Sequence, residues 1–179
     1  MAAREASDRL AWVARAVAAA PGERVLEVGC GHGVLVTLLA AAVGEAGRVV
    51  AVDRSPRMGE AATRRNRAAV EAGRVRVVVA PVADADLGGG DFDVVVASDV
   101  RALWTPGPEW DVVDRVLAPG GRVVLAASLM DPGGGPRLVA ALTGLAGSRG
   151  LAVTAATATT ATRPYPTAAV ELRRAAAAG

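Results

Sequence analysis

Glycines at every second position, Gly29, Gly31 and Gly33, form the segment whose residue types most directly suggest ligand binding. Glycine lacks a Cβ atom and tolerates positive φ, so a ligand can lie directly against the main chain. The apolar residues 34–43 that follow predict a helix, whose first N–H groups and dipole favour an anionic group. Because the third glycine comes one residue earlier than in the G-x-G-x-x-G pattern of dinucleotide-binding proteins, the spacing disfavours NAD.

Two carboxylates accompany this turn and could bind polar groups of the same ligand. Glu27 lies two residues before Gly29 inside an apolar run, and Asp53 ends the apolar run 48–52. An ionised carboxylate accepts two hydrogen bonds at once, which suits the paired hydroxyl groups of a ribose. We therefore predict that Asp53 binds a ribose; its alternative role is to cap the helix that follows.

A second candidate group follows the apolar run 92–98 and comprises Ser98, Asp99 and Arg101. In open α/β sheets the ligand crevice lies beyond the carboxyl ends of the strands, so these side chains are expected beside the substrate. Asp99 is predicted to have one of two roles. It either takes part in the chemistry, as a general base or by orienting the substrate, or it holds the loop backbone.

Valine-rich runs alternate with amphipathic segments, and these elements must position the candidate residues. Continuous apolar runs are typical of strands buried on both faces. Strands are expected at 24–29, 48–52, 74–80, 92–98, 122–128, 151–158 and 168–173. Helices are expected at 3–20, 34–43, 56–73, 109–117 and 136–149. Only a Thr/Pro-rich loop joins the last two strands, so they form an antiparallel pair. The pattern predicts an α/β three-layer sandwich with a seven-stranded, mainly parallel sheet and helices on both faces.

Composition narrows the class of protein further. A chain of 179 residues predicts one domain spanning 1–179, with an N-terminal helix within 1–20 and a frayed tail at 175–179. The net charge is only +2, so nucleic-acid binding is not implied. Cys30 is the single cysteine, which excludes an internal disulfide and fits a reducing compartment. Without a signal-like or membrane-spanning segment, the expected location is the cytoplasm and no membrane partner is expected.

Five segments, in order, resemble motifs of the class I S-adenosylmethionine (SAM)-dependent methyltransferases. They are the glycine turn at 25–33, the acid-terminated strand at 49–53, the acidic segment 83–85, the F-D-x-V strand at 92–97 and the L-x-P-G-G turn within 116–124. The resemblance covers about residues 20–174 and implies the strand order 3-2-1-4-5-7-6, with strand seven antiparallel. It also implies SAM as the cofactor and S-adenosylhomocysteine (SAH) as the product.

The resemblance assigns roles to individual residues. Glu27 would lie near the amino group of the methionine moiety, and Asp84 would accept from the adenine amino group, with Asp86 as its competitor. The full set of expected cofactor-binding residues is Glu27, Gly29, Cys30, Gly31, Gly33, Asp53, Arg54, Asp84 and Ser98. Asp99 is the candidate catalytic residue on the acceptor side.

Several residues near the expected site have two interpretations. Cys30 is expected to pack as a small apolar residue, and His32 to be a loop residue with no chemical role. Trp104 and Trp110 either wall the acceptor pocket or pack in the core. Tyr165, at the tip between the last two strands, belongs either to a substrate lid or to a passive turn.

The predicted function is transfer of the methyl group of SAM to a small-molecule acceptor. Its alternatives are methylation of RNA, which the seven arginines between Arg54 and Arg76 could contact, and SAM binding without catalysis. One histidine and scattered carboxylates provide no recognisable metal-ligand spacing, so no metal is expected. The acceptor's identity and the oligomeric state are left open by the sequence.

Overall fold

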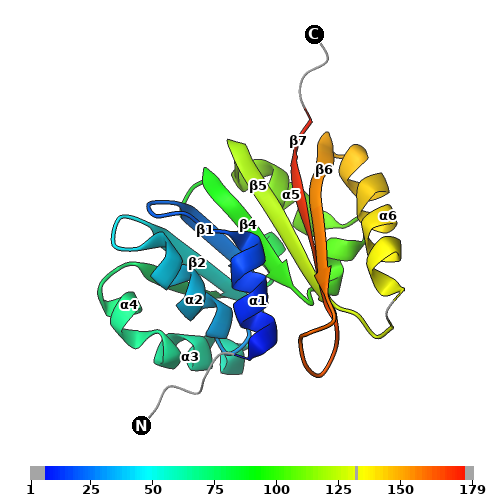
Figure 1. Ribbon diagram of the computed structural model, residues 1–179. Coiled ribbons are helices and arrows are strands. Elements are labelled where there is room, and N and C mark those ends of the chain that lie inside the picture. Colours follow the sequence, from blue (N-terminus) through cyan, green and yellow to red (C-terminus); the bar gives the residue numbers. More distant parts are fainter. Residues whose placement is uncertain (1–6, 132, 176–179) are drawn as a thin grey trace.

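The computed structural model describes residues 7–131 and 133–175, which form one seven-stranded sheet in the order β3-β2-β1-β4-β5-β7-β6 (Figure 1). Strands β1 to β5 are parallel, and β7 is antiparallel to both of its neighbours, β5 and β6. The strands are β1 Arg24–Val28, β2 Arg48–Asp53, β3 Val75–Val79, β4 Phe92–Ser98, β5 Leu117–Ser128, β6 Leu151–Thr159 and β7 Thr167–Arg174. This topology confirms the predicted fold class.

Helices cover both faces of the sheet, as predicted. Buried side chains of α1, α2 and α3 pack against one face, and those of α5 and α6 pack against the other. The helices are α1 Asp8–Val17, α2 Val34–Val43, α3 Pro56–Arg65, α4 Arg67–Glu71, α5 Pro108–Val116 and α6 Gly134–Gly147, with the 3-10 turns η1 Val82–Asp84 and η2 Arg101–Trp104. No helix in these ranges is long and apolar enough to cross a membrane.

The single helix predicted over 56–73 is instead two helices, because Asn66 interrupts it. The Asn66 side-chain amide is buried and donates to the carbonyls of Gly33 and Ala62, at 3.0 and 2.9 Å. Its oxygen accepts from the Thr37 hydroxyl at 2.8 Å. Asparagine side chains compete with the main chain for such bonds, which ends α3 and at the same time holds the glycine turn in place.

Other boundaries also differ from the sequence prediction. The predicted helix 3–20 is described only from Asp8 to Val17, because Ala18 adopts a left-handed conformation and residues 1–6 lie outside the described ranges. Strand β5 begins at Leu117 rather than at Arg122, since the Pro-Gly-Gly segment stays extended and Leu117 pairs with Phe92. Of the expected frayed tail 175–179, all but the first residue lie outside the described ranges.

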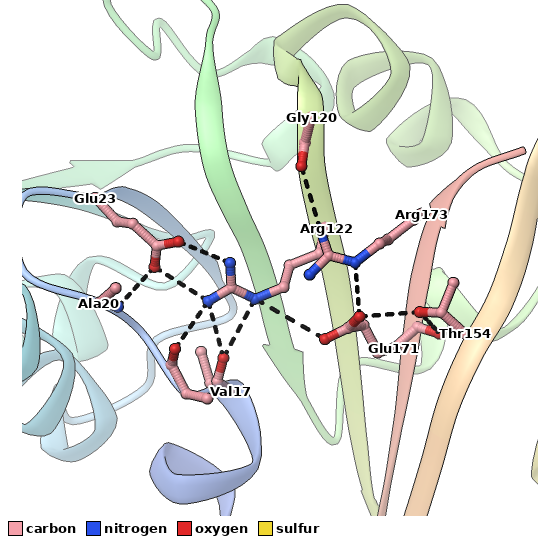
Figure 2. A network of polar contacts seen from close by, with 9 residues as sticks. Val17, Ala20, Glu23, Gly120, Arg122, Thr154, Glu171 and Arg173 are labelled. Atoms are coloured by element: carbon pink, nitrogen blue, oxygen red, sulfur yellow. Dashed lines mark hydrogen bonds and ion pairs between the residues drawn. The ribbon is translucent and has the colours of Figure 1, made fainter. Parts of the chain in front are cut away.

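A buried arginine fixes α1 against the sheet (Figure 2). Arg122 of β5 donates to both carboxylate oxygens of Glu23, at 2.7 and 3.0 Å, and to the carbonyls of Val17 and Ala18, at 3.1 and 3.0 Å. Helix α1 therefore runs across the sheet, with its last turn held at the amino ends of the strands. Its first turn lies at their carboxyl ends, where Arg9 contacts Ser98.

Candidate active site

The glycine turn after β1 is tied to the sheet and leaves one glycine open. Gly29, Gly31 and Gly33 all have positive φ, of 74°, 52° and 74°. A Cβ atom on Gly29 would lie 2.5 Å from the Val100 side chain, and one on Gly33 would lie 2.8 Å from the backbone of Ala62. A Cβ on Gly31 would have no atom within 4 Å. The free space in front of Gly31 is where a ligand can approach the main chain.

Asp53 closes this turn from the end of β2. One carboxylate oxygen accepts from the main-chain N–H of Gly31, and the other from that of Ser55, both at 2.9 Å. Ser55 in turn caps α3. A carboxylate offers about four lone-pair positions, so each oxygen of Asp53 keeps capacity for a further donor such as a ribose hydroxyl. The cap of α3 is therefore Ser55 and not Asp53, and the ribose role of Asp53 stays a prediction.

A cleft of 620 Å³ opens beside the turn, at the carboxyl ends of β1, β2 and β4. Its lining consists of Val28, Gly29, Val52, Asp53, Arg54, Ala80, Pro81, Val82, Ser98, Asp99, Val100, Arg101, Ala102 and Glu109. Four predicted cofactor residues, Gly29, Asp53, Arg54 and Ser98, are therefore brought together here with Asp99. The position agrees with the rule that open α/β sheets bind ligands beyond the carboxyl ends of their strands.

Glu27 is a buried acid directly beneath the turn. It is 3% exposed, and its Oε2 atom has no hydrogen-bond partner among the described residues. Burial, together with the charge of Asp53, raises the pKa of Glu27 to about 8. A buried carboxyl oxygen without a partner is costly. A cationic ammonium group at the turn would relieve that cost, so the residues present fit the methionine end of SAM.

Asp99 is held by three donors. Its Oδ1 accepts from the main-chain N–H of Ser128 at 2.7 Å, and its Oδ2 accepts from the Ser128 hydroxyl at 3.0 Å. Arg9 of α1 lies 2.9 Å from the same Oδ2 and donates to the Ser98 hydroxyl, also at 2.9 Å. These contacts favour the loop-holding alternative for Asp99, since its carboxylate links α1, β4 and β5.

The other five predicted cofactor residues are outside the cleft lining: Glu27, Cys30, Gly31, Gly33 and Asp84. Asp84 is exposed and lies outside the lining, because η1 turns Val82 and Ala85 inward and Asp84 outward. Its competitor Asp86 also lies outside, where it accepts from the N–H of Gly88 and contacts Arg76. The adenine role expected for Asp84 stays a prediction, and the cleft at this point is lined by Pro81 and Val82.

The residues with two interpretations in the sequence lie partly in the core and partly on the surface. Cys30 is buried in the core, and burial raises the pKa of its thiol to about 12, as expected of a packing residue. Trp110 is fully buried, so it packs and does not wall a pocket. Trp104 is half-buried outside the cleft lining. His32 is exposed, and its carbonyl accepts from Arg65. Tyr165 is 40% exposed on the β6–β7 loop.

Sequence reasoning missed Arg9, Ser128 and Glu109. Arg9 and Ser98 are 89 positions apart, and no local pattern reports a contact across that separation. Glu109 lies in the first turn of α5, where an acid is favoured by the helix dipole alone, so the sequence carries no distinct signal for its place in the cleft lining. Among residues 7–131 and 133–175, no group of three or more His, Cys, Asp or Glu side chains could hold a metal ion.

Comparison with known proteins places this site in a family. Residues 25–121, more than half of the chain, match the family described as "Methyltransferase domain". The chain is 36% identical over 116 residues to a nocamycin O-methyltransferase of Saccharothrix syringae, covering 63% of this chain and 40% of the relative. It is 32% identical over 107 residues to a ubiquinone/menaquinone biosynthesis C-methyltransferase of Geotalea daltonii, covering 59% and 46%. The chain thus matches less than half the length of these relatives.

The fold comparison agrees. The magnesium protoporphyrin IX methyltransferase of Synechocystis, solved with bound SAM, superposes with a TM-score of 0.67 at 22% identity, over 93% of this chain and 76% of that one. The matched residues 25–121 contain the glycine turn, Asp53 and the strands that carry the cleft. The chain therefore belongs to the class I SAM-dependent methyltransferase family.

Proposed function

We propose that this protein transfers the methyl group of SAM to a nucleophilic atom of a small-molecule acceptor. The observation that carries the proposal is that Asp53, Ser98 and Asp99 line one cleft. Asp53 also accepts from the N–H of Gly31, which has open space where a Cβ atom would lie. The names of two relatives, an O-methyltransferase and a C-methyltransferase of small molecules, support this class of acceptor.

In the cofactor half of the cleft, SAM would be bound by main-chain groups and carboxylates. When bound, SAM supplies a methyl group already activated on its sulfonium sulfur. Gly31 leaves room for the ligand against the main chain, Asp53 accepts from the ribose hydroxyls, and Glu27 provides negative charge beneath the ammonium group. Pro81 and Val82 supply apolar surface for the adenine ring.

The acceptor half must align the nucleophile and, for O or N acceptors, remove its proton. Asp99 is already engaged by Arg9 and Ser128, so we assign it to positioning the loop at the end of β4. Glu109 is the remaining carboxylate of the cleft lining, beside Asp53 and Asp99. We assign the general-base role to Glu109.

The test is transfer of labelled methyl from SAM in a metabolite-containing cell extract, followed by separation into low-mass, protein and RNA fractions. The proposal expects a labelled low-mass product that chromatography separates from SAM, and no such product when the extract is filtered to remove small molecules. Label confined to RNA or to protein would overturn the acceptor class. SAH binding without transfer into any fraction would instead favour a SAM-binding domain without catalysis.

A further inference from the structure

Four arginines gather at the amino ends of the strands, on the side of the sheet away from the cleft at their carboxyl ends. Arg24 begins β1, Arg48 begins β2, Arg74 directly precedes β3, and Arg76 lies within β3. They line a cavity of 210 Å³ together with Val50, Leu87 and Phe92. The cavity is at the amino ends of the strands, whereas the candidate active site is at their carboxyl ends.

Strand register brings these arginines into a row. Arg24 pairs with Arg48 across β1 and β2, and Val50 pairs with Arg76 across β2 and β3. Val49 pairs with Val75 and donates to the carbonyl of Arg74, so Arg74 continues the row by one strand. Neighbouring strands are about 4.8 Å apart, and like charges placed opposite one another destabilise a sheet.

Little negative charge offsets this row. Arg76 faces Asp86 at 3.9 Å, but no carboxylate of residues 7–131 or 133–175 lies within 4.0 Å of the guanidinium of Arg24, Arg48 or Arg74. Arg48 donates to the carbonyls of Glu45 and Gly47, which fixes its guanidinium without neutralising it. Asp93 accepts from the main-chain N–H of Arg24 and not from its side chain.

The cavity is shaped for a compact anion. The Arg24 guanidinium stacks over the Phe92 ring at 5.3 Å, so the floor is apolar and the ring itself is buried. A volume of 210 Å³ holds about seven water molecules, which is close to the size of a diphosphate group. Guanidinium groups match phosphate oxygens in geometry and charge. No exposed ring at this cavity offers a platform for successive bases, which disfavours a nucleic-acid strand.

We propose that the arginine pocket, defined by Arg24, Arg48, Arg74 and Arg76, binds a small ligand through a diphosphate group. That group has two sources, free pyrophosphate and the diphosphate of a nucleotide. The proposal is independent of the methyltransferase assignment, because the pocket and the cleft share no lining residue.

Isothermal titration calorimetry at fixed low ionic strength tests the pocket with pyrophosphate, ADP and a single-stranded uridine oligonucleotide. The parent should bind pyrophosphate or ADP. Equal affinities identify the free diphosphate as sufficient, and tighter binding of ADP identifies a nucleotide. The Arg48→Gln/Arg74→Gln variant should lose affinity about 10- to 100-fold, since each arginine contributes charge-assisted hydrogen bonds.

The matched control is Arg64→Gln/Arg67→Gln, which removes the same charge from exposed i,i+4 pairs with Glu60 and Glu71. It should bind pyrophosphate as the parent does, and both double variants should bind SAH within about twofold of the parent. Arg74→Gln alone leaves intact the contacts of Arg48 with the carbonyls of Glu45 and Gly47. This single variant should also bind pyrophosphate more weakly than the parent, and it tests the pocket even if the double variant unfolds.

Three outcomes would overturn the proposal. The first is no binding of pyrophosphate or ADP by the folded parent. The second is an equal loss in the control pair, which would indicate a general charge effect. The third is binding of the oligonucleotide alone, lost on Arg48→Gln/Arg74→Gln, which would make this surface a contact for nucleic acid.

Discussion

At the scale of single residues, two carboxylates at the glycine turn differ in their structural contacts. Asp53 accepts from Gly31 and Ser55 before any ligand arrives. Glu27 has no such partner and is buried with one orphaned oxygen. The two acids should therefore respond differently to substitution.

Asp53→Ala should weaken SAH binding about 10- to 100-fold, the usual effect of losing hydrogen bonds to a charged group. It should also lower thermal stability, because the Gly31 and Ser55 N–H groups lose their acceptor. Calorimetry and thermal unfolding measure the two effects. Asp86→Ala removes an acid outside the cleft and should leave SAH binding unchanged. Equal SAH affinity in Asp53→Ala and the parent would show that the ribose assignment is wrong.

Glu27 should make SAH binding depend on pH. With its pKa raised to about 8, Glu27 is protonated in the free protein at neutral pH, whereas an ammonium group bound beside it favours the carboxylate. Binding therefore releases a proton, and affinity should rise with pH up to about 8, by at most about tenfold per pH unit. Glu27→Gln should flatten this profile. A pH-independent parent would contradict the prediction.

Glu109→Gln should lower the rate of methyl transfer to an O or N acceptor about 100-fold or more, the usual contribution of a positioned base. SAH affinity should stay within about twofold, because the substitution keeps shape and removes only a proton acceptor. Steady-state kinetics with the identified acceptor measures the effect. A rate equal to that of the parent would remove Glu109 from the mechanism.

At the scale of elements, α1 is held at both ends by arginines. Arg122 of the sheet fixes its last turn, and its own Arg9 fixes its first turn to Ser98 and Asp99 (Figure 2 shows the Arg122 end). The Arg9 contacts are partly exposed, so they contribute little to overall stability. They instead set the position of the acceptor-side loop.

Arg9→Gln should therefore lower the rate of methyl transfer while changing the free energy of unfolding by less than about 1 kcal/mol. SAH affinity should remain within about twofold of the parent. Arg15→Gln is the matched control, since it removes the same charge from an exposed position of the same helix. An equal loss of rate in both variants would assign the effect to the charge of α1 and not to the Asp99 contact.

Elements also show where sequence reasoning succeeds and where it ends. The strand positions, the glycine turn and the place of Asp53 at the end of a strand were predictable, because buried parallel strands and positive-φ turns leave local signals in residue type and spacing. The strand order followed from the family resemblance. Asn66 was not predictable, since its bonds to Gly33 and Thr37 depend on tertiary contact. The exposure of Asp84 was not predictable for a related reason: the inward face of η1 is set by which residues pack, and Val82 and Ala85 occupy it.

At the scale of the whole molecule, the Arg122 network joins α1, the start of β1, β5 and β7. Burial raises the pKa of Glu23, but the hydrogen bonds and charge of Arg122 outweigh it, and the net shift is downward from 4.5. A lowered pKa means that the unfolded chain binds the proton more tightly. The stabilisation is therefore present above pH 4.5 and is lost as the pH falls through the lower folded value.

Arg122→Ala should lower the free energy of unfolding by about 3–5 kcal/mol, because Glu23 and the carbonyls of α1 lose a buried partner. Its stability should also vary less with pH below 4.5 than that of the parent. Denaturant titrations across this range measure both effects. Arg173→Ala, which removes a more exposed arginine of the same network, should cost less than about 1 kcal/mol. Equal losses would show that the buried pair is not the main contact.

The path of the chain across the sheet decides how the protein can be attached to a surface. Helix α1 begins beside the cleft, with Arg9 on Ser98, whereas β7 ends at Arg174, which pairs with Leu151 at the far edge (Figure 1). A biosensor that captures the protein through a tag before α1 would place its matrix against the mouth of the cleft. Capture through a tag after β7 leaves the cleft facing solution. In that geometry the measured association rates reflect ligand binding to the cleft and not obstruction by the matrix.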